Sequence, residues 1–268
     1  MRKAIFDFSI RFLLFERAHD AVDRGYPDHR SRPRVPLILS LCIAIICSPV
    51  LICAGIYNSK HNLSVSGPGP ATAVSETEVC IFCHTPHNAF PDSPLWNHEL
   101  SAAQNYTNYY SESLKAYPPG GAPPIDGFSK LCLSCHDGAI ALGATIGSRR
   151  GNIAMRSVPG IVQSGHLARD AAGYIGTDLS GGHPVSFVFD AHLASLRNAE
   201  PDLMHLNWPI IDPDVKLYET AGGFGVQCTS CHDPHGGKGG PDSPPFWRKT
   251  TFEDVCLVCH DIFSQIEG

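Results

Sequence analysis

One long stretch of the chain, from residue 37 to residue 54, is mostly apolar and has no charged side chain. The chain has 22 prolines and 25 glycines, nearly all of them outside this stretch, and they divide the rest of the sequence into loops. Residues 101–110 and 190–198 are predicted as short helices, and alternation over 185–189 predicts a short strand. The pattern therefore predicts a mostly irregular, loop-rich fold with short helices and little sheet.

A basic segment precedes the apolar stretch. Residues 1–34 hold eight Lys or Arg and five Asp or Glu, and Arg30, Arg32 and Arg34 come directly before the apolar residues. A positive flank, an apolar run and then small residues are typical of an export signal, so residues 35–55 are predicted as one. The run is also at the lower edge of what spans a bilayer, so an uncleaved anchor with a cytoplasmic tail is the alternative. The leader is long for a signal, and a true start later in the chain would also explain it.

The charge reverses after the apolar stretch. The whole chain has 20 Lys and Arg and 26 Asp and Glu, so from residue 56 onward twelve basic residues remain against twenty-one acidic ones. A nucleic-acid-binding protein is expected to carry a basic patch, and this composition argues against that class. An acidic exported protein is expected to dock on basic partner surfaces.

The pentapeptide Cys-x-x-Cys-His occurs four times, which is the pattern of c-type haem attachment. Two thiols three residues apart lie on one side of a helical turn, where they can add to the vinyl groups of one haem, and the histidine then ligates the iron. Disulfides or zinc would use the cysteines but leave the adjacent histidine unexplained. We therefore predict four covalently attached haem c groups that fill the core. The predicted thioether cysteines are Cys80, Cys83, Cys132, Cys135, Cys228, Cys231, Cys256 and Cys259, and the proximal ligands are His84, His136, His232 and His260.

The four motifs belong to an internal repeat. A lone histidine, Cys-x-x-Cys-His-x-Pro-His, Pro-Asp-Ser-Pro with a following Trp, and Cys-x-x-Cys-His-Asp occur in this order twice. Each copy is predicted to be one two-haem unit, the first at residues 56–137 and the second at 183–268. Residues 138–182 are predicted to join them.

The repeat also selects the distal iron ligands, because a general ligand should occur in both copies. His61 and His183 meet this condition, and so do His87 and His235, which gives eight histidines for four irons. The remaining histidines after the leader lack a counterpart and are more often surface residues. They are His98, His166, His192 and His205.

Local geometry suggests how the ligands are shared. His87 lies three residues after His84 and can hardly reach the opposite face of the same haem, so it is expected to ligate the haem of Cys132 and Cys135. By the same argument His235 is expected to ligate the haem of Cys256 and Cys259. His61 and His183 then serve the remaining two haems, in either order.

The chain resembles the multihaem cytochromes with doubled CxxCH motifs. The resemblance rests on KHNLS at 60–64, CIFCHTPHN at 80–88, PLWNH at 94–98, GGHPVSF at 181–187 and CTSCHDPHG at 228–236. It is most similar to tetrahaem members that polymerise into extracellular filaments. The resemblance implies bis-histidine haems in a chain, electron transport across or beyond the cell envelope, and redox proteins or extracellular acceptors as partners. In such filaments a histidine near the mature N-terminus can ligate a haem of the adjacent subunit, and His61 would be that residue.

The sequence favours an exported electron carrier in the periplasm, on the outer surface or outside the cell. A multihaem reductase of a nitrogen or sulfur oxyanion is an alternative, but it needs an iron with an open distal position, and eight ligands for four irons leave none open. A membrane-anchored subunit that takes electrons from the quinone pool is the other alternative. In that case residues 35–55 would be retained and would contact the membrane.

Overall fold

The computed structural model describes residues 55–90, 95–101, 103, 105–147, 152–238 and 246–262. All of them lie in the second, residues 45–268, of the two units into which the chain divides. The predicted leader, nearly all of the predicted signal and the two Pro-Asp-Ser-Pro stretches lie outside the described residues. No helix among those that are described is long and apolar enough to cross a membrane.

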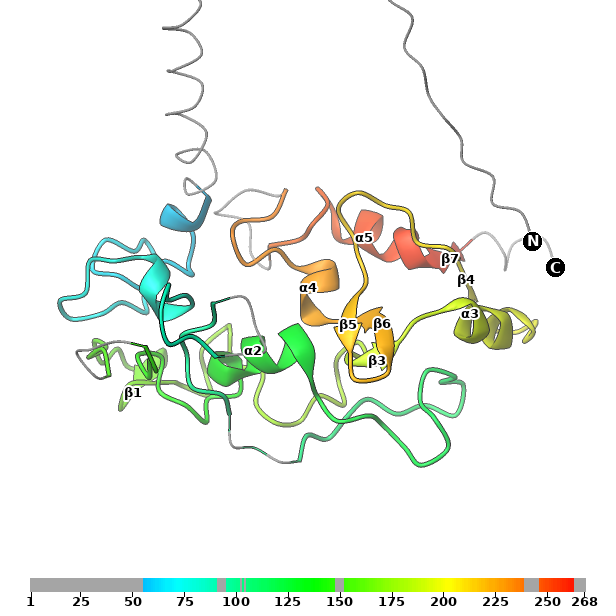
Figure 1. Cartoon of the computed structure of the whole chain (residues 1–268), viewed down its shortest axis with the longest axis horizontal. Helices are drawn as coiled ribbons and strands as arrows, with labels where there is room; N and C mark the ends of the chain where they lie inside the picture. Colours follow the sequence, from blue (N-terminus) through cyan, green and yellow to red (C-terminus); the bar gives the residue numbers. More distant parts are fainter. Residues whose placement is uncertain are drawn as a thin grey trace, which may run out of the picture. The chain divides into compact units, whose positions relative to one another are not determined.

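Short helices carry all four Cys-x-x-Cys-His motifs, as the sequence predicts. The 3₁₀ helix η1 holds the first motif, and three α-helices hold the others (Figure 1). The remaining helix, α3, carries no motif. It confirms the helix predicted at 190–198 and begins one residue later than predicted. The bounds are η1 Cys80–Phe82, α2 Gly127–His136, α3 Ala191–Asn198, α4 Cys228–Cys231 and α5 Phe252–Cys259.

The strands are short and form small antiparallel sheets. β3, β6 and β5 make a three-stranded sheet, in which β5 and β6 are joined by a two-residue turn. β3 lies within the strand predicted at 185–189 but is only two residues long. The bounds are β1 Val162–Gln163, β2 His166–Leu167, β3 Phe187–Val188, β4 His205–Leu206, β5 Tyr218–Thr220, β6 Gly223–Val226 and β7 His260–Asp261.

Side-chain caps explain where two of these helices begin. The Asp190 carboxylate accepts from the backbone N–H of Leu193 at 2.8 Å, and the Thr251 hydroxyl accepts from that of Asp254 at 3.1 Å. Each cap satisfies a donor that has no partner inside its helix. Glu253 and Asp254 add negative charge in the first turn of α5, where the helix dipole favours it.

The helix predicted at 101–110 is wrong, because the described residues of this segment are not helical. Tertiary contacts hold it in an irregular conformation instead. Thr107 accepts from the N–H of Leu179 at 2.7 Å and donates to the carbonyl of Thr177 at 2.9 Å. The Tyr106 hydroxyl donates to the Asp137 carboxylate at 2.8 Å. Asn, Thr and Tyr are weak helix formers, so these long-range bonds prevail over the local preference.

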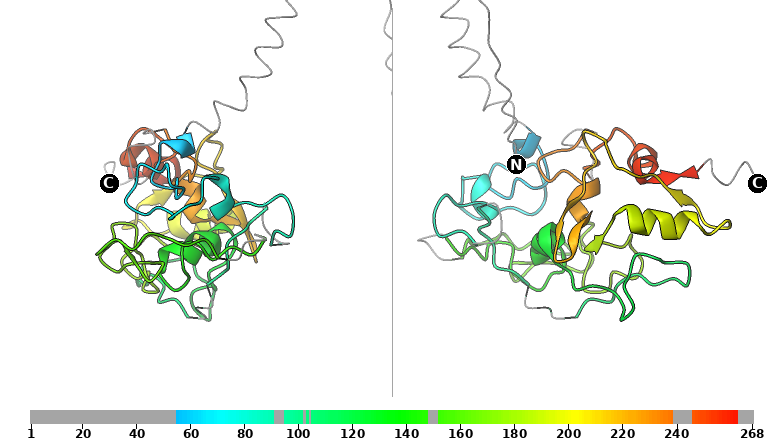
Figure 2. Two further views of the ribbon diagram at one scale, coloured as in Figure 1. Left: turned by 90° about the vertical axis from the view of Figure 1, so that its left-hand side faces the viewer. Right: turned by 45° about the vertical axis from the view of Figure 1, so that its right-hand side comes forward.

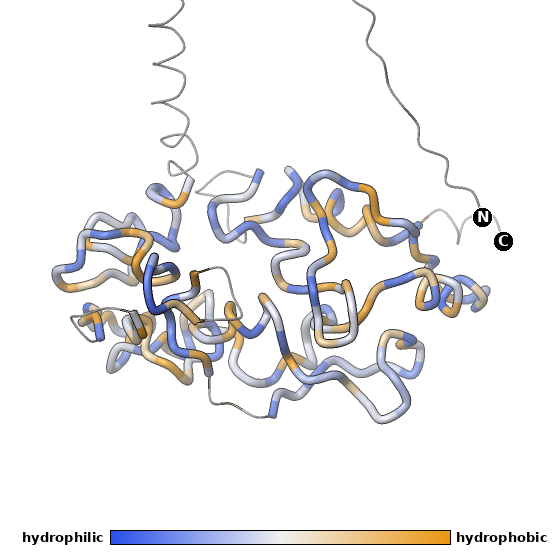
Figure 3. Tube along the Cα trace, viewed as in Figure 1, coloured by the Kyte–Doolittle hydropathy of each residue, from blue (hydrophilic) through white to orange (hydrophobic). Residues whose placement is uncertain are grey.

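Buried apolar side chains come from many parts of the described chain. One cluster joins Phe187, Phe189, Leu193 and Val226, so it connects β3, α3 and β6. Both views of Figure 2 show irregular backbone between the short elements. Along the described trace, hydrophobic and hydrophilic segments alternate over short distances (Figure 3).

The repeat predicted from the sequence is also a repeat of hydrogen bonds. In the first copy Thr85 N–H donates to Leu95 and Asn97 N–H donates to Cys83, both at 2.9 Å. The second copy has the equivalent pair of bonds, from Asp233 to Phe246 and from Arg248 to Cys231, also both at 2.9 Å.

In each copy these bonds flank an isolated antiparallel β-bridge. The bridges join His84 to Trp96 and His232 to Trp247. The residue before each Trp has a positive φ, 56° at Leu95 and 63° at Phe246. The segment after each motif therefore folds back on the proximal histidine in the same way twice.

Candidate metal centres

A buried polar junction ties α2 to α4 and so joins the two halves of the repeat (Figure 1). Gln227 is fully buried, and its side-chain oxygen accepts from Ser129 N–H at 2.9 Å while its amide donates to Asp126 at 2.9 Å. The Ser129 hydroxyl accepts from the N–H of Cys228 at 3.0 Å. The start of each helix is thus fixed against the other, which places their first cysteines together.

The Cys132 and Cys228 thiols are hydrogen-bonded to each other across this junction. As the donor in this bond, Cys132 has a pKa raised well above its ordinary value, and burial raises it further. As the acceptor, Cys228 has a pKa lowered to about 7. The second and third motifs, which come from different halves, therefore meet at their first cysteines.

The other motifs are neighbours of these two. Burial raises the pKa of Cys83 to about 12, and the charge of Cys135 adds to the shift. Burial raises the pKa of Cys231 to about 11, with a further contribution from Cys256. Electrostatic interactions thus link the first motif to the second and the third to the fourth.

Three pairs of histidine rings lie at nearly the same distance, with planes 17° apart for His84 and His235 and 70–73° apart for the other two pairs. The ring centroids are 6.1 Å apart for His84 and His235, 6.0 Å for His136 and His61, and 6.2 Å for His260 and His183. Aromatic pairs in general fall in this range. What distinguishes the three pairs is that each joins one predicted proximal ligand to one predicted distal ligand.

This spacing suits a metal atom between the rings. An imidazole nitrogen lies about 2 Å from a bound metal, so two imidazoles on opposite sides of one atom have centroids about 6 Å apart. The donor chemistry also fits, because the eight motif cysteines are free thiols rather than disulfides. The free thiols of the motifs and the spacing of the three ring pairs are therefore compatible with c-type haem attachment at the first, second and fourth motifs.

Backbone carbonyls set the tautomer of three of these histidines. Nδ1 lies 3.0 Å from the Pro234 oxygen in His61, 2.6 Å from that of Gly173 in His136, and 2.7 Å from that of Pro184 in His183. A carbonyl can only accept, so each Nδ1 carries the proton and each Nε2 keeps its lone pair. Histidines that bind metals are typically oriented by such a second hydrogen bond.

Two further observations concern polar atoms without a protein partner. Within the described part of the chain, Trp96 Nε1 and His260 Nδ1 are buried and lack a hydrogen-bond partner. Trp96 lies edge-on to His84 with the centroids 6.3 Å apart. A haem carries two propionates, which accept hydrogen bonds from such donors, so these atoms also fit the group that the motifs require.

The structure pairs the histidines differently from the sequence-based expectation. His235 was expected at the Cys256–Cys259 haem but lies against His84, and the ring facing His260 is that of His183. His61 faces His136 of its own chain, where the resemblance suggested an adjacent subunit. The expectation assumed that each half is closed on itself, whereas the α2–α4 junction brings the halves together.

His87 and His232 lie outside these three pairs. His87 was expected to serve the Cys132–Cys135 haem, but the ring that faces His136 is His61. His87 is exposed, and its carbonyl accepts from the Thr85 hydroxyl at 2.9 Å. The His232 ring stacks on Trp247 with the centroids 4.5 Å apart.

The histidine His98, which lacks a counterpart in the repeat, is completely buried. Its ring nitrogens lie 2.8 Å from the Glu99 carbonyl and 3.0 Å from that of Ala141. Nε2 also lies 3.5 Å from Cys135 Sγ. Both nitrogens are therefore engaged by the protein, which gives His98 a structural place beside the second motif. The sequence contained one indication of this structural role, because Lys249 occupies the position of His98 in the second copy of the repeat.

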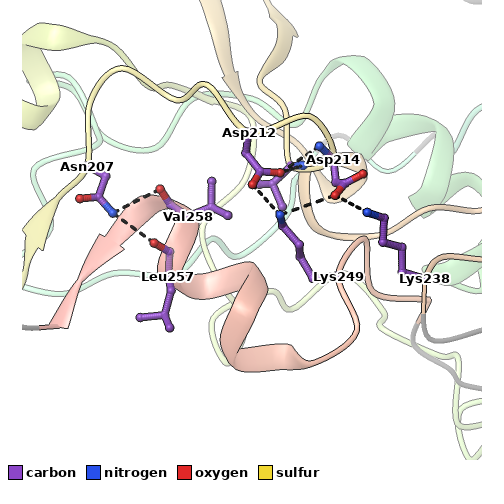
Figure 4. A network of polar contacts seen from close by, with 8 residues as sticks. Asn207, Asp212, Asp214, Lys238, Lys249, Leu257 and Val258 are labelled. Carbon is purple, nitrogen blue, oxygen red and sulfur yellow. Dashed lines mark hydrogen bonds and ion pairs between the residues drawn. The ribbon is translucent and has the colours of Figure 1, made fainter.

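The fourth motif is fixed by a strand and by an ionic network (Figure 4). β4 pairs with β7, and the Asn207 side chain then donates to the carbonyls of Leu257 and Val258 at 3.1 and 3.4 Å. Lys249, which lies just before α5, donates to Asp212 at 2.5 Å.

Lys249 and Lys238 both contact Asp214, at 3.5 and 2.6 Å. Burial alone would raise the pKa of Asp212, but the bond from Lys249 and two backbone N–H groups lower it overall. The network thus ties the loop before β5 to both ends of the segment that leads into α5.

A comparison with known families agrees with this description. Residues 222–265, which hold the third and fourth motifs, match the family described as doubled CXXCH motif. The match is consistent with a multihaem c-type cytochrome, a haem-binding protein of electron transfer, and the motifs imply covalently bound haem c. No curated protein matches the chain.

Proposed function

We propose that the protein is an exported tetrahaem cytochrome that passes electrons along a row of four haem c groups. The observation that carries the proposal is the contact between Cys132 and Cys228. These cysteines come from different halves, and each would be a thioether of a different haem. Two haems attached at contacting sulfurs have their edges close together, so electrons can move between the halves.

The proximity of the motifs to one another supports electron transfer from haem to haem. The first motif neighbours the second through Cys83 and Cys135, and the third neighbours the fourth through Cys231 and Cys256. The Cys132–Cys228 contact and the His84–His235 ring pair both join the first half to the second. Each haem would therefore have at least one other haem as a close neighbour.

The ring pairs support an electron carrier more than an enzyme. Each of the pairs His84–His235, His136–His61 and His260–His183 would close both faces of one iron. Haem enzymes need a distal position that a substrate can enter, and a bis-histidine iron lacks it. By count, His87 would ligate the fourth iron, opposite His232.

The haem content and the spin state test this function. Pyridine haemochrome analysis combined with the mass of the intact chain should give four haems, and the oxidised protein should show only low-spin iron. Carbon monoxide and nitrite should not bind without denaturant. A smaller number of haems, or a high-spin signal that nitrite alters, would overturn the proposal in favour of a different cofactor load or a reductase.

Localisation and partners follow from sequence features. The acidic composition after residue 55 supports docking on basic surfaces of other redox proteins or extracellular acceptors. Sequencing the mature N-terminus distinguishes an exported protein, which begins near Gly55, from an anchored one. Assembly into filaments rests on the resemblance of the motifs, and negative-stain microscopy of extracellular material tests it.

A further inference from the structure

One of the predicted ligand histidines has an anionic partner. His235 Nδ1 lies 3.5 Å from Asp233 Oδ1, and the same carboxylate oxygen accepts from the His235 backbone N–H at 3.0 Å. The corresponding partners of His61, His136 and His183 are neutral backbone carbonyls. The Asp233–His235 contact is thus different in charge from the other three.

The repeat shows that this carboxylate is particular to the second copy. Thr85 occupies the position of Asp233 in the first copy, and its hydroxyl donates to the His87 carbonyl. Asp233 is half-exposed, and an ordinary aspartate, with a pKa of about 3.9, is a carboxylate at neutral pH. Arg248 Nη1 lies 4.0 Å from its other oxygen and offsets part of the charge.

A hydrogen-bond acceptor on Nδ1 makes the imidazole a stronger donor to its metal, and an anionic acceptor does so more than a neutral one. A stronger donor favours Fe(III) over Fe(II), which lowers the reduction potential. With haem bound, Asp233 would influence the uptake of one electron from a redox partner, with no bond broken and no proton moved. Since the ring of His235 faces His84, the affected iron would be that of the first motif.

We propose that Asp233 is a positioning residue that lowers the reduction potential of the haem attached at Cys80 and Cys83. The inference rests on the proposed function, because it requires His84 and His235 to ligate one iron. It assigns a residue of the second half to the control of the first haem in the row. That haem would then be harder to reduce than it would be with a neutral partner.

Haem-resolved redox titration of the holoprotein tests this role. Asp233→Asn keeps an acceptor for the His235 backbone N–H but removes the charge, and Asp233→Thr copies the first half of the repeat. At a fixed ambient potential, the ratio of reduced to oxidised iron should rise in one haem of both variants. The ratio should be about threefold to tenfold higher than in the unmodified protein. Asp178→Asn, which removes an exposed carboxylate bonded within its own turn to Ser180, is the control and should shift none.

A double variant identifies the haem. His235→Met should change the potential and the spectrum of the same haem, and Asp233→Asn should add no further shift in that background, since coupled residues are not additive. Four low-spin haems without a shift in either Asp233 variant would overturn the inference and leave the proposed function intact. Fewer than four haems, or a high-spin iron in the unmodified protein, would instead overturn the proposed function.

Discussion

His61 Nδ1 donates to the Pro234 carbonyl at 3.0 Å, across 173 positions of the sequence. The bond joins the lone histidine of the first half to the Cys-x-x-Cys-His-x-Pro-His motif of the second. The next residue, His235, faces His84 of the first half. Pro234 thus orients His61, which we assign to the iron of the second motif, and His235 is the residue that we assign to the iron of the first motif.

His235→Met is expected to change the haem attached at Cys80 and Cys83. In the full protein one low-spin haem should lose its bis-histidine spectrum, because methionine replaces one of its two nitrogen ligands. In a chain that lacks this haem, made by changing Cys80 and Cys83 to alanine, the same substitution should leave the other three spectra unchanged. A change in the spectrum of one of those three haems would contradict the pairing.

His98→Leu is expected to destabilise the protein without altering any haem ligand. Both ring nitrogens face carbonyls, the single N–H of a neutral imidazole donates to one of them, and leaving that buried carbonyl without its donor costs on the order of 1–3 kcal/mol. Thermal unfolding should show this loss, while the oxidised spectrum stays low-spin. A new high-spin signal in His98→Leu would mean that His98 is a ligand.

Leu95 and Phe246 occupy equivalent positions with positive φ but differ in burial, so glycine should affect them in opposite directions. Leu95 is exposed, and Leu95→Gly should relieve about 1 kcal/mol of backbone strain. Phe246 is buried and lies 4.9 Å from the His61 ring, so Phe246→Gly should cost about 2–3 kcal/mol, the loss of packing less the relieved strain. Denaturant unfolding of the two variants measures both values, and equal effects would contradict the argument.

Asp212→Asn is expected to reduce stability at neutral pH and to matter less in acid. The folded pKa of Asp212 is lowered, so the stabilisation is complete above the unfolded value, about 3.9, and is lost as the pH falls through the folded value. The difference in melting temperature between the natural protein and Asp212→Asn should therefore be present at pH 6 and shrink by pH 3. Lys249→Gln should lower the melting temperature with the same pH dependence. A loss of melting temperature that is equal at pH 6 and pH 3 would contradict a stabilising ion pair.

The sequence contained the information for the local structure around each motif. The Cys-x-x-Cys-His spacing predicted short helices at all four motifs, and the repeat predicted the equivalent positions of Trp96 and Trp247. Matching residues in two copies make the same local bonds, and such bonds depend on neighbours in the chain. The unexpected detail is chemical, since Asn97 and Arg248 both bond the carbonyl after the first cysteine with different side chains.

Long-range contacts were not predictable in the same way. No motif spacing predicts that Gln227 is buried against Ser129, although this junction brings the two halves and their histidines together. The helix predicted at 101–110 failed for a similar reason, because bonds to residues 177–179 hold that segment. A repeat specifies two similar units, but it carries no information on whether their ligands are exchanged.

The proposed exchange of ligands would affect the order in which the protein matures. In an exported cytochrome, the first half would leave the ribosome and the export machinery before the segment with Pro234 and His235. Until that segment arrives, the first two irons would lack their distal histidines and the Nδ1 acceptor of His61. Haems attached to the first half would lack a distal histidine for as long as the second half is missing, so completion of the chain would also shield the haems that were attached first.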